Sequence, residues 1–299
     1  MSKQKTESDH YDETLIFLKG ALAQAGKPVS DGHAHQSAQL TKHAWEALFP
    51  RSGWTRDVIT LRGARPALME AIRLDYTNTF AMILLAGTFW SEARAFADLA
   101  EAIAKRAKGL LPEALRTPHK LWSVGDSHER TYLTTIVHCV NLLDSAERYE
   151  SANRLRLEAM KRDKRDGFGF RYFVVAHALM VGDVTTVRKW LKWASKERQR
   201  LEFWCWVEVL LARLSGDADA DATARAMTLE PLVPFYIVLG PQPIFEIEGG
   251  GVRVGSDQEQ HYHAAILERA WLSHPDDFDL LFKMTESVRK AARNAPSTH

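Results

Sequence analysis

The cluster of residues best suited to binding chemistry lies between positions 189 and 200, where basic side chains alternate with tryptophans. Its members are Lys189, Trp190, Lys192, Trp193, Lys196, Arg198 and Arg200. Such a mixture can bind a nucleic acid, because cations neutralise phosphates and aromatic rings stack on bases. The same residues also suit a solvated outer helix face with the tryptophans turned inward. Glu197 and Glu202 interrupt the cluster, which favours the second interpretation.

A second candidate is the stretch Gly167-Phe168-Gly169-Phe170-Arg171-Tyr172. Glycines before a helix expose backbone N–H groups that can bind an anion, and Arg171 would add a positive charge. The alternative is a tight turn between two helix pairs, with Arg171 paired to an acidic residue such as Glu129. The stretch lacks the full pattern of a dinucleotide or phosphate loop, and no parallel sheet is predicted before it. The turn is therefore favoured.

Three aromatic residues, Phe203, Trp204 and Trp206, form a third candidate. Large rings in a groove are common anchors for a bound peptide. Aromatic residues at helical spacing also pack helix against helix, and this alternative is favoured here.

The histidines do not predict a metal centre. His33, His35 and His43 form one group and His261 and His263 another, and neither has the Glu or Cys companions of a zinc site. Histidines at positions i and i+2 of a helix point apart. His33 and His35 are expected in a loop over residues 28–35, where the backbone does not force their side chains apart. We expect no metal and no cofactor.

The cysteines do not predict a catalyst either. Cys139 and Cys205 fall in apolar helical segments and fit two buried thiols in a reducing compartment better than a disulfide framework. The chain contains no Gly-x-Ser-x-Gly string and no recognisable serine–histidine–acid arrangement. The sequence therefore indicates no catalytic residue, although groups that converge from distant positions leave an enzyme open.

Composition is that of an ordinary folded protein. The chain has 299 residues, of which 45% are hydrophobic and 26% charged, and a formal net charge of +1. This balance provides no overall attraction to a polyanion. The first ten residues are polar, and the apolar run Phe80–Trp90 is too short to span a bilayer. We expect a cytoplasmic protein without a membrane partner.

Repetition at a fixed spacing indicates the elements that must position these residues. Arg148, Gly182 and Gly216 lie 34 residues apart, and each opens a similar stretch. A period of 34 is typical of the tetratricopeptide repeat, a helix–turn–helix unit that buries its apolar face by stacking on its neighbours. The sequence predicts an all-α protein, a tetratricopeptide-like α-solenoid. Its helix pairs are expected at 128–144 with 147–162, 167–181 with 184–197, and 199–214 with 218–228.

The repeats define the predicted organisation of the chain. It consists of a disordered tail at 1–10, a helical N-terminal cap at 11–64, repeats at 65–230, a proline-rich segment with a short hairpin and C-terminal helices at 231–293, and a loose tail at 294–299. Pro66 suits the first turn of a helix. The hairpin is indicated by alternating residues in 244–254 around three glycines. Residues 232–239 are predicted to cap the last repeat or, alternatively, to close a pocket over a small ligand.

Three strings resemble a known group of proteins: His128-Glu129-Arg130-Thr131-Tyr132, the stretch from Arg165 to Tyr172, and Leu232-Val233-Pro234-Phe235-Tyr236-Ile237-Val238-Leu239-Gly240. They are similar to a branch of tetratricopeptide-like proteins that includes many bacterial members and is related to the suppressor-of-tumorigenicity-seven family. The chain departs from that branch in having no proline after Arg130-Thr131, and Lys164-Arg165-Asp166 in place of an asparagine-rich turn. The resemblance implies a helical scaffold rather than a catalyst.

The functional expectation is a protein-binding scaffold that holds a peptide or a partner domain on the concave face of the helical array. Its candidate contacts are Glu129, Arg130, Arg171, Tyr172, Trp204 and Trp206. Two alternatives remain open: a nucleic-acid-associated repeat protein that uses the Lys189–Arg200 face, and a regulatory protein that binds a small ligand.

Overall fold

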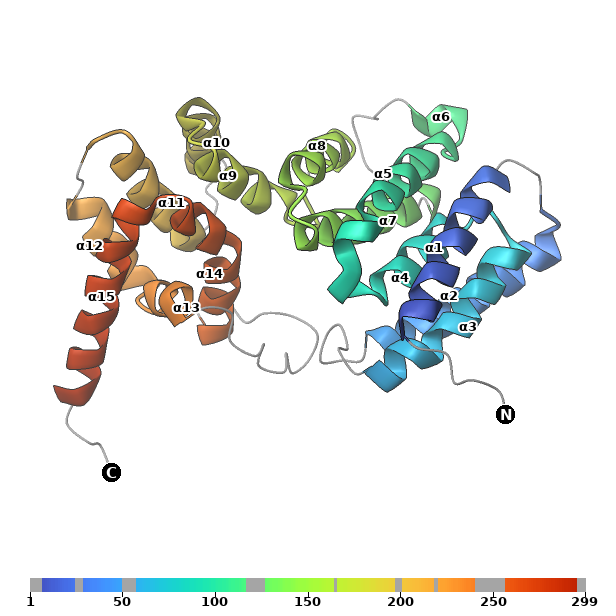
Figure 1. Cartoon of the computed structure of the whole chain (residues 1–299). Coiled ribbons are helices and arrows are strands. Elements are labelled where there is room, and N and C mark those ends of the chain that lie inside the picture. The colour runs from blue at the N-terminus through green and yellow to red at the C-terminus, as the bar shows by residue number, and fades with distance from the viewer. Residues whose placement is uncertain are drawn as a thin grey trace. The chain divides into compact units, whose positions relative to one another are not determined.

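The computed structural model describes residues 7–24, 29–49, 58–116, 127–163, 166–196, 201–217, 220–239 and 256–294. Every regular element in these ranges is a helix, which confirms the predicted all-α class (Figure 1). The chain forms two compact units, Met1–Phe170 (unit 1) and Arg171–His299 (unit 2). The predicted repeat segment, 65–230, runs across this division.

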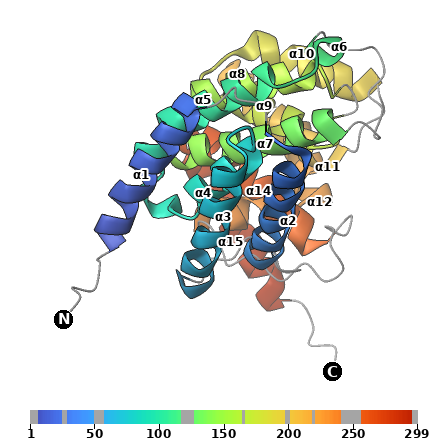
Figure 2. The ribbon, with the colours of Figure 1, turned by 90° about the vertical axis from the view of Figure 1, so that its right-hand side faces the viewer.

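The first half of unit 1 is a set of helices that pack on one another in chain order. They are α1 (Glu7–Gln24), α2 (Asp31–Leu48), α3 (Val58–Leu74), α4 (Thr79–Gly87), the 3-10 turn η1 (Trp90–Glu92) and α5 (Ala93–Gly109). α2 packs on α3, α3 on α4, and α4 on α5, while α1 lies beside α4 and α5 (Figure 2). Leu68, Ile72 and Leu84 are fully buried between them, as the apolar faces of stacked helices require.

The second half of unit 1 continues with α6 (Glu113–Arg116), α7 (Ser127–Ser145) and α8 (Tyr149–Met160). α7 is the central helix, because it packs against α4, α5 and α8. Leu133, Ile136 and Leu143 form its buried side. Thr131, Asn141 and Ser145 of the same helix are exposed.

Unit 2 contains α9 (Phe170–Met180, which begins at the unit boundary), α10 (Val184–Lys196), α11 (Leu201–Leu214), α12 (Ala220–Leu229), α13 (Val233–Leu239), α14 (Asp257–Leu272) and α15 (Pro275–Asn294). α11 packs on α10 and α12, and α13 packs on α14 and α15. Trp206 and Trp271 are completely buried and meet edge to face, with ring centroids 6.3 Å apart. Val233 and Ile237 of α13 are buried as well, so this short helix contributes to the core of unit 2.

The same turn follows α7, α9 and α11. In each, one residue has a positive φ: Glu147 at 61°, Gly182 at 71° and Gly216 at 76°. The N–H of the next residue donates to a carbonyl five residues back, in Arg148 to Leu143, Asp183 to Ala178 and Asp217 to Ala212. This is the Schellman motif, which satisfies the last carbonyls of a helix and suits glycine at the left-handed position.

These turns correct the predicted register by one residue. The residue equivalent to Gly182 and Gly216 is Glu147 rather than Arg148. The first spacing is therefore 35 residues and the second 34, and the left-handed position of the first turn is occupied by a residue other than glycine.

Three local predictions near the N-terminus are also corrected. α1 begins at Glu7, within the tail that was expected to be disordered. α2 begins at Asp31, because the Ser30 hydroxyl accepts a hydrogen bond from the His33 N–H and caps the helix, so residues 31–35 are not a loop. Pro66 lies inside α3 rather than in a first turn.

Some predictions fall outside the described residues. They concern the hairpin at 244–254, Arg198 and Arg200 in the basic cluster, the first six residues, and the tail after Asn294. They stay predictions.

Candidate functional site

The six predicted partner contacts are divided between the two units. Glu129 and Arg130 belong to unit 1, and the other four belong to unit 2. Glu129 is buried, and its carboxylate lies 3.9 Å from the guanidinium of Arg162, which lies over the Tyr132 ring. The acidic partner predicted for Arg171 is thus engaged by Arg162. Arg130 is exposed on the same helix.

The aromatic candidates of unit 2 are packing residues. Trp204 and Trp206 are buried, and the Trp206 indole N–H donates to the Glu230 carbonyl at 3.2 Å. Tyr172 is half-buried and meets Phe203 edge to face at 4.6 Å. Apart from half-buried Tyr172, these rings are not available as surface anchors, which agrees with the packing alternative.

The glycine–aromatic stretch forms the turn into α9. Asp166 and Gly169 have positive φ, and the Asp166 side chain accepts a hydrogen bond from the Phe170 N–H at 2.7 Å. Arg171 places its guanidinium 4.2 Å from the centre of the Trp193 ring. The N-terminus of α9 is thus capped by a carboxylate of the chain itself, and Arg171 makes a cation–π contact.

The described part of the basic cluster forms an exposed face of α10. Lys189, Lys192 and Lys196 are exposed, whereas Trp190 and Trp193 are half-buried and meet at 5.8 Å. α10 also carries Arg188 and contains no acidic residue between Val184 and Lys196. This helix is locally basic in a chain of balanced charge.

The histidine groups do not converge. No group of three His, Cys, Asp or Glu side chains that could hold a metal ion occurs in the described ranges. His33 and His35 lie two residues apart on α2, where their side chains diverge. His263 is buried with its Nδ1 2.6 Å from the Glu230 carboxylate, so its ring is engaged inside unit 2.

The thiols are unsuited to nucleophilic chemistry. Cys139 and Cys205 are both free and buried. Burial raises the pKa of the Cys139 thiol far above its ordinary value, and it raises that of Cys205 to about 12, with the Glu230 charge adding to the effect. Since the thiolate is the reactive form, both side chains behave as small apolar residues.

The described residues of unit 1 line two hollows that were not predicted from the sequence. The large hollow has a volume of about 580 Å³ and lies between α2, the α3–α4 turn, the end of α5 and the start of α7. Its lining mixes rings with short polar side chains: Thr41, Trp45, Asp75, Thr77, Asn78, Phe80, His128, Thr131 and Tyr132 among others. This volume is in the range of ligand-binding pockets.

A hydrogen-bond network makes one wall of the large hollow rigid. The Asn78 amide donates to the hydroxyls of Ser37 and Thr41, each at 2.9 Å, and its oxygen accepts from the Ala81 N–H. Ser37 in turn donates to the Ala71 carbonyl at 2.8 Å. Asn78 therefore caps α4 and joins it to α2 and α3, and both hydrogens of its amide group are used.

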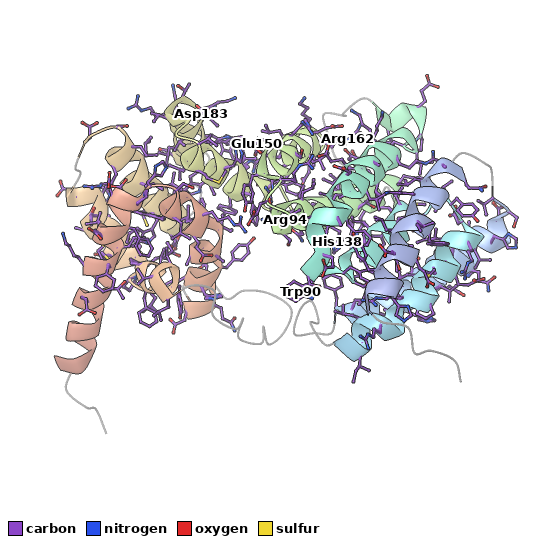
Figure 3. The ribbon with its side chains drawn as sticks, viewed as in Figure 1. Trp90, Arg94, His138, Glu150, Arg162 and Asp183 are labelled. Atoms are coloured by element: carbon purple, nitrogen blue, oxygen red, sulfur yellow. The ribbon has the colours of Figure 1, made fainter. Side chains whose placement is uncertain are left out.

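The small hollow has a volume of about 190 Å³ and lies between α4, η1 and the second half of α7. It is lined by Phe49, Ile83, Gly87, Trp90, His138, Asn141, Leu142 and Ser145. Trp90 is 45% exposed, and Figure 3 shows it in the same region of unit 1 as His138.

An aromatic cluster separates the two hollows. His138 lies with its ring centroid 5.1 Å from that of Trp45, 5.4 Å from Phe49 and 5.7 Å from Phe80. Trp45 and Phe80 line the large hollow, whereas Phe49 and His138 line the small one. Burial lowers the pKa of His138 to about 4, so the ring is neutral at pH 7.

Residues of α7 line both hollows, and we call this set of residues the α7 face. Its residues are His128, Thr131, Tyr132, His138, Asn141, Leu142 and Ser145. At about 100° per residue, the three residues at the large hollow lie on a side of the helix turned by roughly 80° from that of the four at the small hollow. Burial raises the pKa of the Tyr132 phenol well above its ordinary value, so it is a neutral hydrogen-bonding group.

The string His128–Tyr132 was the part of the sequence that could have indicated the α7 face. It supplies three of the residues that line the large hollow, whereas the contacts predicted from this string are Glu129 and Arg130. Those two positions lie between the lining residues on the helix, and Glu129 faces the interior.

Comparisons with protein-family models, with curated proteins and with solved structures found no match. No described helix is both long enough and apolar enough to cross a membrane.

Proposed function

We propose that the chain is a protein-binding scaffold of the tetratricopeptide-like solenoid type, and that the α7 face of unit 1 binds an extended peptide of a partner protein. The observation that carries the proposal is that residues along α7 line both hollows. The three equivalent Schellman turns, with the packing of α7 on α8 and of α11 on α12, support the repeat architecture.

The dimensions of the α7 face suit a short extended segment. From Thr131 to Ser145 the helix rises about 21 Å, at roughly 1.5 Å per residue. An extended chain covers this distance with about six residues, at roughly 3.3 Å each. Short polar side chains on the face can pair with peptide groups, and the rings beside them offer apolar contacts.

Affinity capture from the native cell followed by mass spectrometry tests this function. We expect a specific protein to be retained by the unaltered chain and lost with Thr131→Arg, which places a long cation at the large hollow. Thr228→Arg is the matched control, because Thr228 is exposed on α12 of unit 2. If Thr131→Arg and Thr228→Arg retain the same proteins, the α7 face is not the binding surface.

A second candidate function is nucleic-acid binding through α10. It is favoured by the exposure of Lys189, Lys192 and Lys196 on a helix with no acidic residue. Binding should weaken steeply with salt, because each neutralised phosphate releases counterions. A gel shift at low salt with RNA and with DNA tests it, and glutamate at the three lysine positions should abolish the shift. No shift at micromolar protein would remove this candidate.

We also propose a cytoplasmic location. The two buried, unpaired cysteines support a reducing compartment. Fractionation of the native cell tests it, and recovery with the membrane fraction after a salt wash would contradict it.

A further inference from the structure

One wall of the large hollow consists of hydrogen-bond acceptors. It is formed by Thr41, Asp75, Thr77 and Asn78, and we call these four residues the acceptor wall. Both amide hydrogens of Asn78 are donated, one to Ser37 and one to Thr41. The Thr41 hydroxyl donates its hydrogen to the Ser37 carbonyl at 2.8 Å, and the Thr77 hydroxyl donates to the Asp75 carboxylate at 2.6 Å. The side chains of the acceptor wall therefore have no polar hydrogen left to donate, and only their oxygen lone pairs remain.

The Asp75 carboxylate is the charged member of the acceptor wall. Its Oδ1 accepts from the Thr77 N–H at 2.8 Å and from the Thr77 hydroxyl, and these two bonds fix the orientation of the carboxylate. In the described part of the chain, no residue donates to its Oδ2. Asp75 is also half-buried, so its charge is shielded less than that of a fully exposed side chain. A cationic donor makes the strongest hydrogen bond to such an oxygen.

The other charges near the hollow do not favour an anion. Lys42 is the one Lys or Arg among the described lining residues, and Asp75 is their one acidic residue. The Lys42 side chain is 73% exposed, and its Nζ lies 3.8 Å from the carboxylate of Glu46, one turn further along α2. The Glu46 charge offsets that of Lys42, and water screens both. Charge and hydrogen-bonding capacity therefore both select a cationic occupant.

The hollow can also accept the stem of a long side chain. Its volume is about 580 Å³, and its lining includes the apolar side chains of Ala34 on α2 and Leu110 at the end of α5. Long basic side chains pack their methylene groups on apolar surface while the charged end reaches a polar partner. Thr131 and Tyr132 of the α7 face line the same hollow, so a peptide bound to that face lies beside the acceptor wall.

This inference rests on the peptide-binding function proposed above. We propose that the large hollow takes one basic side chain, Arg or Lys, of the bound peptide, and that its charged end donates hydrogen bonds to Asp75 Oδ2 and to the Thr77 hydroxyl oxygen. A neutral side chain of the same length would make the apolar contacts but would leave these acceptors without a donor. The acceptor wall therefore makes a basic residue a shared feature of the partners.

Selection from a phage-displayed library of random twelve-residue peptides, with the full chain as bait, tests the site. Fluorescence polarisation of a labelled selected peptide then measures its affinity for variants. Asp75→Asn removes the charge but keeps the Oδ1 acceptor of the turn. Asp217→Asn is the matched control, since Asp217 is an exposed aspartate in the turn after α11. Thermal melting shows whether the variants are folded.

If Asp75→Asn is destabilised, Ala38→Arg and Ala38→Glu are compared instead. Ala38 is an exposed residue of the same lining, so both changes alter the charge at the hollow without disturbing a buried position. Ala38→Arg should bind the selected peptide about tenfold more weakly than Ala38→Glu, because a fixed cation repels the basic side chain.

We expect the selected peptides to share one basic position and to bind Asp75→Asn about tenfold more weakly or worse, with Asp217→Asn unchanged. Norleucine in place of that basic residue should weaken binding by a similar factor, and Asp75→Asn should then add little, because both changes remove the same contact. Peptides without a shared basic position would overturn the cationic site and leave the scaffold function standing. Binding insensitive to Asp75→Asn, or to the sign of the charge at position 38, would do the same. Selection of no peptide above background would overturn both.

Discussion

α7 of unit 1 and α11 of unit 2 hold equivalent places before the same Schellman turn, yet they use their side chains in opposite ways. α11 presents Phe203, Trp204 and Trp206, which are all buried. α7 presents short polar residues such as Thr131 and Ser145, and hollows of about 580 and 190 Å³ lie beside them. Large rings recruit neighbours that cover them, whereas short polar side chains leave space that a ligand can fill.

The largest effect on stability should be the difference between replacing the buried Trp206 of α11 and replacing the exposed Trp90 beside α7. Trp206→Ala removes a fully buried ring and the hydrogen bond to Glu230, so we expect a loss of about 3–5 kcal/mol in the free energy of unfolding. Trp90→Ala, at a 45% exposed position, should cost less than about 1 kcal/mol. Urea unfolding measures both, and equal losses would refute the contrast between the two helices.

A smaller, pH-dependent effect should come from His138. Burial lowers its folded-state pKa from 6.5 to about 4, so the unfolded chain binds more protons in this range. The stabilisation from the neutral ring is complete above pH 6.5 and is lost as the pH falls toward 4. The loss amounts to about 1.4 kcal/mol per pH unit, or about 3 kcal/mol in total.

Urea unfolding between pH 7 and pH 4 tests this, with His138→Phe as the control. The difference in stability between the two proteins should change across that range, because the phenylalanine does not titrate. A constant difference would show that His138 is not held neutral by its surroundings.

The smallest effects on stability should come from substitutions in the Schellman turns, and they should differ in sign between unit 1 and unit 2. Gly182→Ala puts a Cβ on a left-handed residue and should cost about 1–2 kcal/mol. Glu147→Gly relieves the same strain and should stabilise unit 1 by about 1 kcal/mol, since the exposed pair between Glu147 and Arg94 contributes little. Thermal unfolding measures both, and destabilisation by Glu147→Gly would be the contrary result.

The helices were predictable where local signals agree. A helix pair is predicted at 128–144 and 147–162, and α7 (Ser127–Ser145) and α8 (Tyr149–Met160) match it closely. The glycines at 182 and 216 marked two left-handed turns directly. Glu147 was missed as the third because a non-glycine residue leaves no such mark.

The candidate site was not predictable in the same way. Its rings come from α2, α4 and α7, so Trp45, Phe80 and His138 are far apart in sequence and meet only in the packed unit. A hollow also forms where side chains leave space unfilled, and no residue type in the sequence indicates such a space. The predicted aromatic contacts failed for the complementary reason, since apolar rings at helical spacing drive the packing that buries them.

Photo-cross-linking in the native cell tests the central claim most directly. A benzoylphenylalanine in place of Asn141, on the exposed edge of the α7 face, should cross-link to one specific protein. The same residue in place of Thr228 on α12 should give no product with that protein. Cross-linking from position 228 but not from 141, or equally from both, would contradict a peptide-binding α7 face.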